Sequence, residues 1–186
     1  MAVYNTSSDS SNTAVRALLT KIGEYYLKRS FNTGSGKGKK DWEEIRDNYF
    51  NGKCCYCESD DLKLQIEHLI MFNRTEYGLH HPGNIAPVCT DCNKRRRDDN
   101  KNYLDWKGHL KQICIERNEL DLFEIRKERI LYHMNESEYK YPTLSEAEKH
   151  SIRVIANSLY ENIKTESEKA LNLYKDLDEA FVNNKL

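Results

Sequence analysis

Residues 54–93 read CCYCESDDLKLQIEHLIMFNRTEYGLHHPGNIAPVCTDCN, and they carry the signals from which the core of the chain can be predicted. It holds two C-x-x-C pairs, Cys54 with Cys57 and Cys89 with Cys92, which are separated by 31 residues. Each pair can supply two thiolates from a tight turn, and four thiolates together favour a tetrahedral zinc ion. Because four sulfur ligands leave no open position for water or substrate, we expect this zinc to be structural.

Two further cysteines lie outside these pairs. Cys55 could replace Cys54 as a ligand, but the first pair would then be C-x-C and would match the second pair less well. We expect Cys55 and Cys114 to be buried free thiols. A redox role for the pairs is the alternative, and it is weaker because the second pair lacks the strand-to-helix setting of a thioredoxin-like motif.

The segment between the cysteine pairs predicts two short strands. Apolar residues indicate one strand through residues 64–67 and a second around residues 85–88, with a glycine-bearing loop between them. We expect a helix to start at Cys92, after the second strand. The fold class predicted for the chain is α+β, mostly helical, with a small zinc-containing ββα core.

This order of residues resembles the HNH endonuclease superfamily, whose core is a ββα-metal finger. The resemblance rests on Glu67-His68 at the end of the first strand, on N-I-A-P-V-C starting at Asn84, and on C-x-x-C-N ending at Asn93. It covers residues 54–93 and leaves the rest of the chain uncovered. It implies hydrolysis of DNA phosphodiester bonds that leaves a 3′-hydroxyl and a 5′-phosphate, although RNA is not excluded as a substrate.

Phosphodiester cleavage needs an activated water and a cation that neutralises charge on the phosphoryl oxygens. His68 suits the first role as general base, because its ordinary pKa lies near 6.5. Glu67 and Asn93 suit the second role, since hard oxygen donors hold Mg²⁺ or Mn²⁺. The resemblance implies that Asn84 braces the loop that aims His68. Glu67 stands where Asp is common, and Asn93 stands where many relatives have His, which leaves the coordination open.

Several charged or titratable residues surround this motif. Arg74 lies in the loop, and Lys94, Arg95, Arg96 and Arg97 follow Asn93 directly, so contact with phosphates is as well supported as a solvated charged face. On the expected helix, Arg96 would share the face of Asn93. His80 and His81 are expected to pack in the loop or to face solvent.

The flanking segments predict helices. A helix capped near Ser11 is expected to carry an apolar stripe, and the basic, glycine-rich residues 31–40 are expected to form a mobile linker. Asp41 is expected to cap a second helix, which Asn51-Gly52 ends. Residues 102–118 and the tail after Tyr141-Pro142 also show helical spacing, and at the start of the tail Thr143 and Ser145 predict overlapping capping boxes with Glu146 and Glu148. These segments suggest three parts: residues 1–40, an HNH core at 41–111, and a helical extension at 112–186.

Composition bounds the class of protein. The chain has 186 residues, 32% of them charged, and a net charge of −1. Residues 1–111 hold 18 Lys and Arg against 15 Asp and Glu, so we expect nucleic acid to lie on this part. No apolar run approaches the roughly 20 residues of a spanning helix, and the sequence shows no signal peptide, so a cytoplasmic protein with no membrane contact is expected.

Three hypotheses follow for function. The first is a nuclease, and the second is a zinc-containing module that binds nucleic acid without cutting it. The third is an interaction subunit, suggested by the acidic, helical C-terminal part. Small HNH proteins of this size occur as restriction enzymes and as nuclease subunits of antiphage systems, where the partner is an ATPase. Because the net charge is near zero, we expect a homodimer or a partner protein to assist DNA capture.

Overall fold

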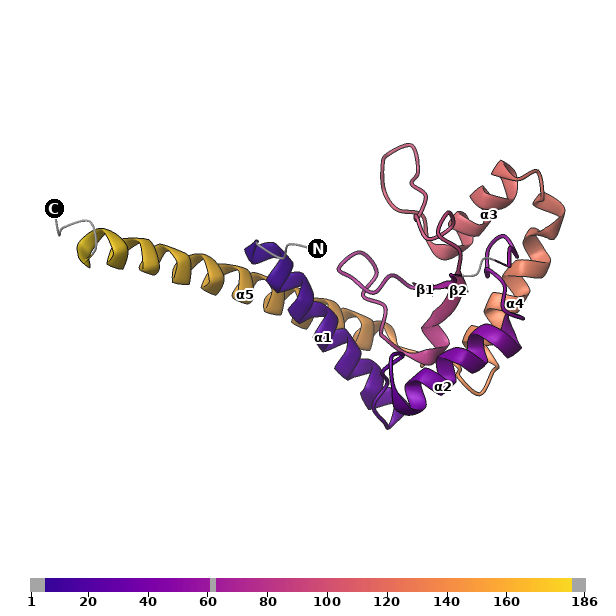
Figure 1. Ribbon diagram of the computed structural model, residues 1–186, viewed down its shortest axis with the longest axis horizontal. Helices are drawn as coiled ribbons and strands as arrows, with labels where there is room; N and C mark the ends of the chain where they lie inside the picture. Colours follow the sequence, from indigo (N-terminus) through magenta and orange to yellow (C-terminus); the bar gives the residue numbers. More distant parts are fainter. Residues whose placement is uncertain (1–5, 61–62, 182–186) are drawn as a thin grey trace.

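A computed structural model describes residues 6–60 and 63–181 (Figure 1). It is mostly helical and contains one small sheet, as an α+β fold does. The long helices are α1 (Ser7–Leu27), α2 (Gly36–Glu44), α3 (Trp106–Glu116), α4 (Phe123–Asn135) and α5 (Glu146–Phe181). In the part of the chain that the structure describes, no helix is apolar over a length that could cross a bilayer.

The sheet joins β1 (Gln65–His68) and β2 (Ile85–Val88) as antiparallel neighbours, with Glu67 opposite Ala86 and His68 opposite Ile85. Both strands lie within one residue of their predicted positions. β2 is buried along its whole length. It lies in a core that also includes Trp42, Trp106 and the four paired cysteines.

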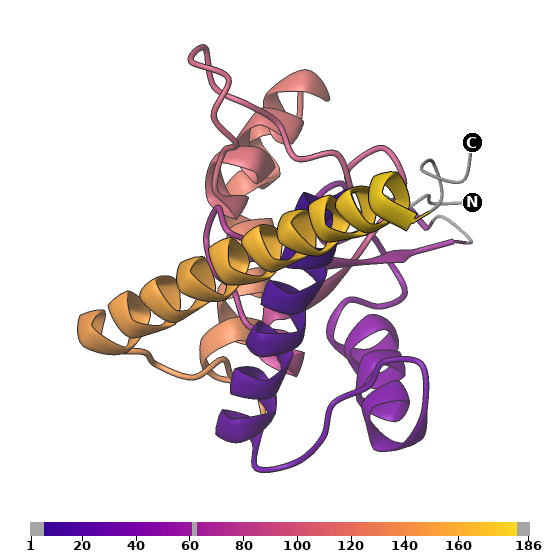
Figure 2. The same ribbon diagram turned by 90° about the vertical axis from the view of Figure 1, so that its left-hand side faces the viewer.

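A second, smaller core joins α1 to α5. Val15 and Leu19 of α1 pack there with Ile152 and Ala156 of α5 and with Leu79 from the loop between the strands. Figures 1 and 2 together show that the two helices cross, while the end of α5 extends past α1. The loop between β1 and β2 packs on this helix pair, so the region around the end of β1 is held by both cores.

The N-terminal predictions need two corrections. α1 begins at Ser7, because the side chain of Thr6 accepts a hydrogen bond from the N–H of Asp9 and so caps the helix earlier than expected. α2 begins at Gly36, within the segment predicted to be a mobile linker. Asp41 is therefore inside a helix and not its cap. Its buried carboxylate pairs with Arg29 at 2.6 Å and with Lys37 at 3.1 Å.

The prediction that a helix starts at Cys92 is wrong. The chain makes a turn there, in which the N–H of Asn93 donates to the carbonyl of Cys89 at 3.0 Å, and it continues as an irregular segment to a bridge between Arg97 and Tyr103. The next helix is α3, which Asp105 caps through a hydrogen bond from the N–H of Gly108. A helix does not directly follow the second strand, so the basic run does not lie on a helical face.

The C-terminal predictions are confirmed in their local signals. Ser145 and Glu148 form a capping box: the N–H of Ser145 donates to the Glu148 carboxylate at 2.7 Å, and the N–H of Glu148 donates to Oγ of Ser145 at 3.3 Å. Along α5 only Ile152 and Ala156 are buried. The apolar side chains near its end, such as Leu177 and Phe181, are exposed.

Gly78 allows the loop between the strands to fold back on itself. A Cβ atom at this position would lie 2.1 Å from the carbonyl oxygen of Ile70 and 3.0 Å from Nδ2 of Asn84. We expect Gly78→Ala to lower the free energy of unfolding by about 1–3 kcal/mol, as overpacking does, measured by urea denaturation. Gly34→Ala is the control, because its Cβ would approach only Oδ1 of Asn32, at 3.3 Å. Equal stability of the two variants would contradict the close approach.

Candidate functional site

The four paired cysteines form one cluster. The Sγ atoms of Cys54, Cys57, Cys89 and Cys92 all lie within 4.8 Å of one another, and all four residues are buried. Sulfur atoms at the corners of a tetrahedron around zinc, each about 2.3 Å from the ion, are about 3.8 Å apart. The 3.7 Å separation of the Cys57 and Cys89 sulfurs matches this spacing. The cluster therefore fits a zinc ion with four sulfur ligands.

Cys55 has a different role from its neighbours. Its N–H donates to the carbonyl of Pro87 at 2.7 Å, which attaches the first cysteine pair to β2. Its thiol is buried, and burial raises its pKa well above the usual value. Cys114 is also buried, and Arg126 lies 3.7 Å from its sulfur. Both thiols are outside the cluster, as the sequence predicts.

Asn84 holds the loop that follows β1. Its Oδ1 accepts a hydrogen bond from the N–H of Ile70 at 2.7 Å, and its Nδ2 donates to the carbonyls of Ile70 and Leu79, both at 2.9 Å. The carbonyl of Asn84 also accepts from the N–H of Leu69. The buried side-chain amide of Asn84 thus binds backbone groups at both ends of the loop that runs from Ile70 to Leu79. These hydrogen bonds fix the position where β1 ends. The side chain of His68 starts from this fixed point.

His68 is partly buried between two rings. The ring of Phe72 stacks on it at a centroid distance of 4.7 Å, and its Nε2 lies 2.9 Å from Nδ1 of His80. Burial, with smaller effects from His80 and Arg16, lowers the pKa of His68 to about 3. The imidazole is therefore neutral at pH 7 and can accept a proton. An anionic phosphodiester nearby would raise this pKa toward the range where a base is most effective.

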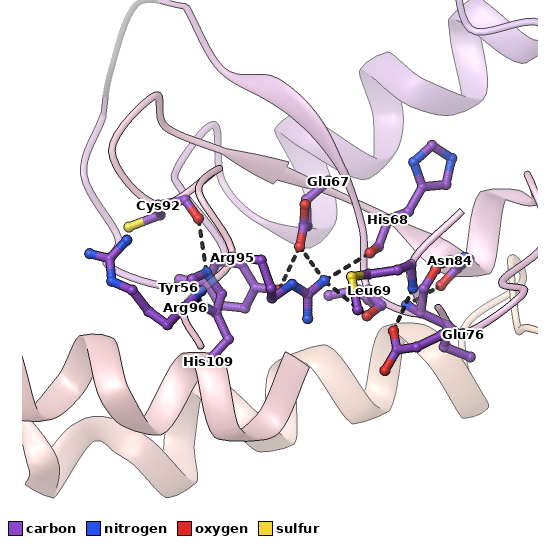
Figure 3. A network of polar contacts seen from close by, with 12 residues as sticks. Tyr56, Glu67, His68, Leu69, Glu76, Asn84, Cys92, Arg95, Arg96 and His109 are labelled. Atoms are coloured by element: carbon purple, nitrogen blue, oxygen red, sulfur yellow. Dashed lines mark hydrogen bonds and ion pairs between the residues drawn. The ribbon is translucent and has the colours of Figure 1, made fainter. Parts of the chain in front are cut away.

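Glu67 lies on the other face of β1 from His68, as neighbouring residues in a strand do. Its Oε1 accepts from the hydroxyl of Tyr56 at 3.2 Å and pairs with Nη2 of Arg95. Burial raises the pKa of Glu67, and the charge of Arg95 opposes that rise. Figure 3 shows Arg95 between this carboxylate and the end of β1. Its Nη2 also donates to the carbonyls of His68 and Leu69, at 3.0 and 3.1 Å.

Asn93 lies at the end of the second cysteine pair. Its side chain is exposed, and its Nδ2 donates to Oε1 of Gln65 at the start of β1. Within residues 6–60 and 63–181, no contact engages Oδ1 of Asn93 or Oε2 of Glu67. Each of these two residues therefore keeps one oxygen that a hard cation could use. The cysteines form the one described group of three or more His, Cys, Asp or Glu side chains close enough to hold a metal.

A cleft of about 790 Å³ brings these predicted residues together, because Glu67, His68 and Asn93 all line it. Arg16, Lys94 and Arg97 line it as well. Among the described residues, none of these three cations has a carboxylate partner, and Arg97 instead stacks on Tyr103 at 4.2 Å. Unpaired cations around a polar cleft favour an anionic ligand.

Three of the predicted basic contacts are engaged elsewhere, and one of them is Arg95, whose buried side chain pairs with Glu67 and binds two carbonyls at the end of β1. Arg96 pairs with Glu116 of α3 at 2.8 Å. Arg74 donates to Asn157 at 3.1 Å and lies over the ring of Tyr160 at 3.7 Å, so it attaches the loop to α5. The expectation that Arg96 shares a helical face with Asn93 is wrong, because that helix does not form.

Sequence reasoning missed three members of the site: Arg16, Tyr56 and His80. Arg16 is one of two exposed cations on α1, and it reaches the cleft because α1 packs against the loop between the strands. Tyr56 lies inside the first cysteine pair, which was a local signal for its proximity to the sheet. His80 is separated from His68 by a loop whose path no spacing rule gives. No protein-family model matches the chain, and neither a curated protein nor a solved structure matches it significantly.

Proposed function

We propose that this chain is a metal-dependent endonuclease of the HNH type, which hydrolyses phosphodiester bonds in DNA. One observation carries the proposal: a neutral histidine, a carboxylate and an amide line the same cleft as three cations that lack carboxylate partners among the described residues. The cations suit a phosphate backbone, and the histidine suits activation of a water molecule. Neither feature would be required of a module that only holds zinc.

The proposed cation is Mg²⁺ or Mn²⁺, held by Oε2 of Glu67 and Oδ1 of Asn93. Two protein oxygens are a sufficient set, because Mg²⁺ keeps several waters and takes other ligands from substrate phosphates. When bound, the cation would neutralise charge on the phosphoryl oxygens. Arg95 then has a structural role, because it pairs with Oε1 of Glu67, a residue that lines the cleft, and holds it against the end of β1.

The proposal is tested with supercoiled plasmid and with RNA, each incubated with zinc-loaded protein plus Mg²⁺, Mn²⁺ or EDTA. Nicking of DNA with either metal and no nicking in EDTA is the expected result. A preparation of His68→Ala made in parallel excludes a contaminating nuclease. Binding of DNA without cleavage under every metal condition would favour the non-catalytic module, and cleavage of RNA alone would change the substrate class.

Lys94 and Arg97 are proposed to contact the phosphate backbone. We expect Lys94→Ala and Arg97→Ala each to weaken DNA binding and to lower the slope of log affinity against log salt by about 0.9, because one fewer counterion is released. Fluorescence anisotropy with zinc-loaded protein and no added Mg²⁺ or Mn²⁺ measures both quantities, because EDTA would also remove the structural zinc. Arg96→Ala is the matched control, since Arg96 pairs with Glu116 and should leave the slope unchanged. If all three variants keep the salt-dependence slope of the wild type, DNA does not contact Lys94 or Arg97.

We further propose that capture of long DNA depends on a second copy or on a partner protein such as an ATPase subunit. The net charge of −1 supplies little general attraction for DNA. The end of α5 carries the exposed apolar side chains Leu173, Tyr174, Leu177 and Phe181, which suit an interface. Efficient cleavage by a monomer at physiological salt would contradict this dependence.

A further inference from the structure

His68 and His80 face one another through their ring nitrogens, with Nε2 of His68 lying 2.9 Å from Nδ1 of His80. The two rings have different surroundings. His68 lines the cleft, whereas His80 packs against the buried ring of Phe31 at a centroid distance of 4.9 Å. His68 therefore faces the proposed substrate, and His80, which is partly buried, contacts His68 from the side of Phe31.

A hydrogen bond between two neutral imidazoles needs one N–H group and one lone pair. In one arrangement, Nε2–H of His68 donates to His80, and Nδ1 of His68 keeps a free lone pair. In the reverse arrangement, Nδ1–H of His80 donates to His68, whose proton is then on Nδ1 and whose only lone pair is engaged. Only the first arrangement leaves His68 with a nitrogen that can take a proton from water.

We propose that His80 is a positioning residue for His68: it accepts the hydrogen bond from Nε2–H and so makes Nδ1 the basic nitrogen. The inference rests on the proposed role of His68 as general base. It adds a residue that acts through His68 and need not touch the substrate. The partner of a catalytic histidine commonly fixes its tautomer and its ring orientation in this way.

The chain holds His80 in place through its backbone. A Cβ atom at Gly23 of α1 would lie 2.3 Å from the carbonyl oxygen of His80, so only glycine lets the helix approach this closely. A glycine inside a helix costs about 1 kcal/mol relative to alanine, and this contact explains why it stands there. Asn84 binds the preceding carbonyl, that of Leu79, at 2.9 Å. With Phe72 stacked on His68, both rings have fixed positions.

Two substitutions at His80 separate positioning from packing. Asn places its Oδ1 near the position of the histidine Nδ1, so His80→Asn keeps an acceptor for His68, whereas His80→Leu keeps volume and removes it. We expect His80→Leu to lower kcat for plasmid nicking about 10–100-fold, the usual effect of losing a group that orients a ligand or base. KM should change little, and His80→Asn should recover most of kcat. Equal kcat in His80→Leu and wild type would overturn the proposal.

Nitrogen-15 NMR of the histidine side chains gives a measurement that does not need activity. The expected wild-type spectrum shows His68 protonated on Nε2, with its signals assigned by their loss in His68→Ala. In His80→Leu the preference for this tautomer should disappear. A His68 protonated on Nδ1 in the wild type would overturn the proposal. If the wild type cuts no substrate, the proposed nuclease function fails, while the tautomer still decides whether His80 orients His68.

Discussion

Replacing Cys89 with serine is expected to abolish zinc binding and to unfold the core around the sheet. Structural zinc contributes roughly 10–16 kcal/mol in small zinc domains, whereas a whole domain is stable by about 5–15 kcal/mol. The four cysteines are buried in the same core as Trp42 and Trp106. The zinc content measured by elemental analysis should therefore fall from about one ion per chain to almost none. Fluorescence of the two tryptophans should shift as they become exposed.

Helical circular dichroism should fall less than the tryptophan signal, because α1 and α5 have a separate core. Cys114→Ser is the matched control. Its sulfur is buried and lies near Arg126, outside the cluster, so zinc content and fluorescence should be retained. A Cys89→Ser protein with the zinc content and the tryptophan fluorescence of the wild type would rule out the four-cysteine site.

Replacing His68 with alanine is expected to lower the rate of DNA cleavage by about 10²–10⁴-fold, the usual contribution of a positioned general base. The ring is only partly buried and lies at the end of β1, so the fold should survive its removal. Plasmid nicking under single-turnover conditions measures the rate. Zinc content and the thermal transition, measured on the same preparation, show whether the protein is still folded.

His150→Ala is the control for a general effect of losing an imidazole. His150 is exposed on α5, away from the residues that line the cleft. The His150→Ala variant should cleave DNA at the wild-type rate. If His68→Ala and His150→Ala cleave equally fast, His68 is not the base, even if the protein proves to be a nuclease.

Local patterns in the sequence predicted much of the fold. The strands, the cysteine cluster and the capping box of Ser145 with Glu148 depend on neighbouring residues or on one type of ligand, so the sequence specifies them directly. The second helical segment continues beyond α2 as a π-helix, Ile45–Tyr49, and ends just before Asn51-Gly52, whose φ angles are positive, 54° and 66°. These are short-range preferences that few tertiary contacts override.

The helix expected after Cys92 failed for a tertiary reason. Arg95 is drawn to Glu67 and to two carbonyls at the end of β1, and these contacts require an irregular backbone between the cysteine pair and α3. The pairing of His68 with His80 and the arrival of Arg16 at the cleft also depend on the packing of distant segments. A pattern of residue types carries no information about such meetings, since any cation or histidine nearby in sequence would fit it equally well.

α5 also sets a length scale. At about 1.5 Å per residue, its 36 residues extend over about 54 Å, whereas the 21 residues of α1 extend over about 32 Å. Figure 1 shows the surplus as a rod that projects past the crossing with α1. A partner bound near Phe181 would be held far from the sheet. α5 would then act as a rigid spacer that sets the distance between this partner and the cleft. Deleting whole turns of α5 would shorten that distance.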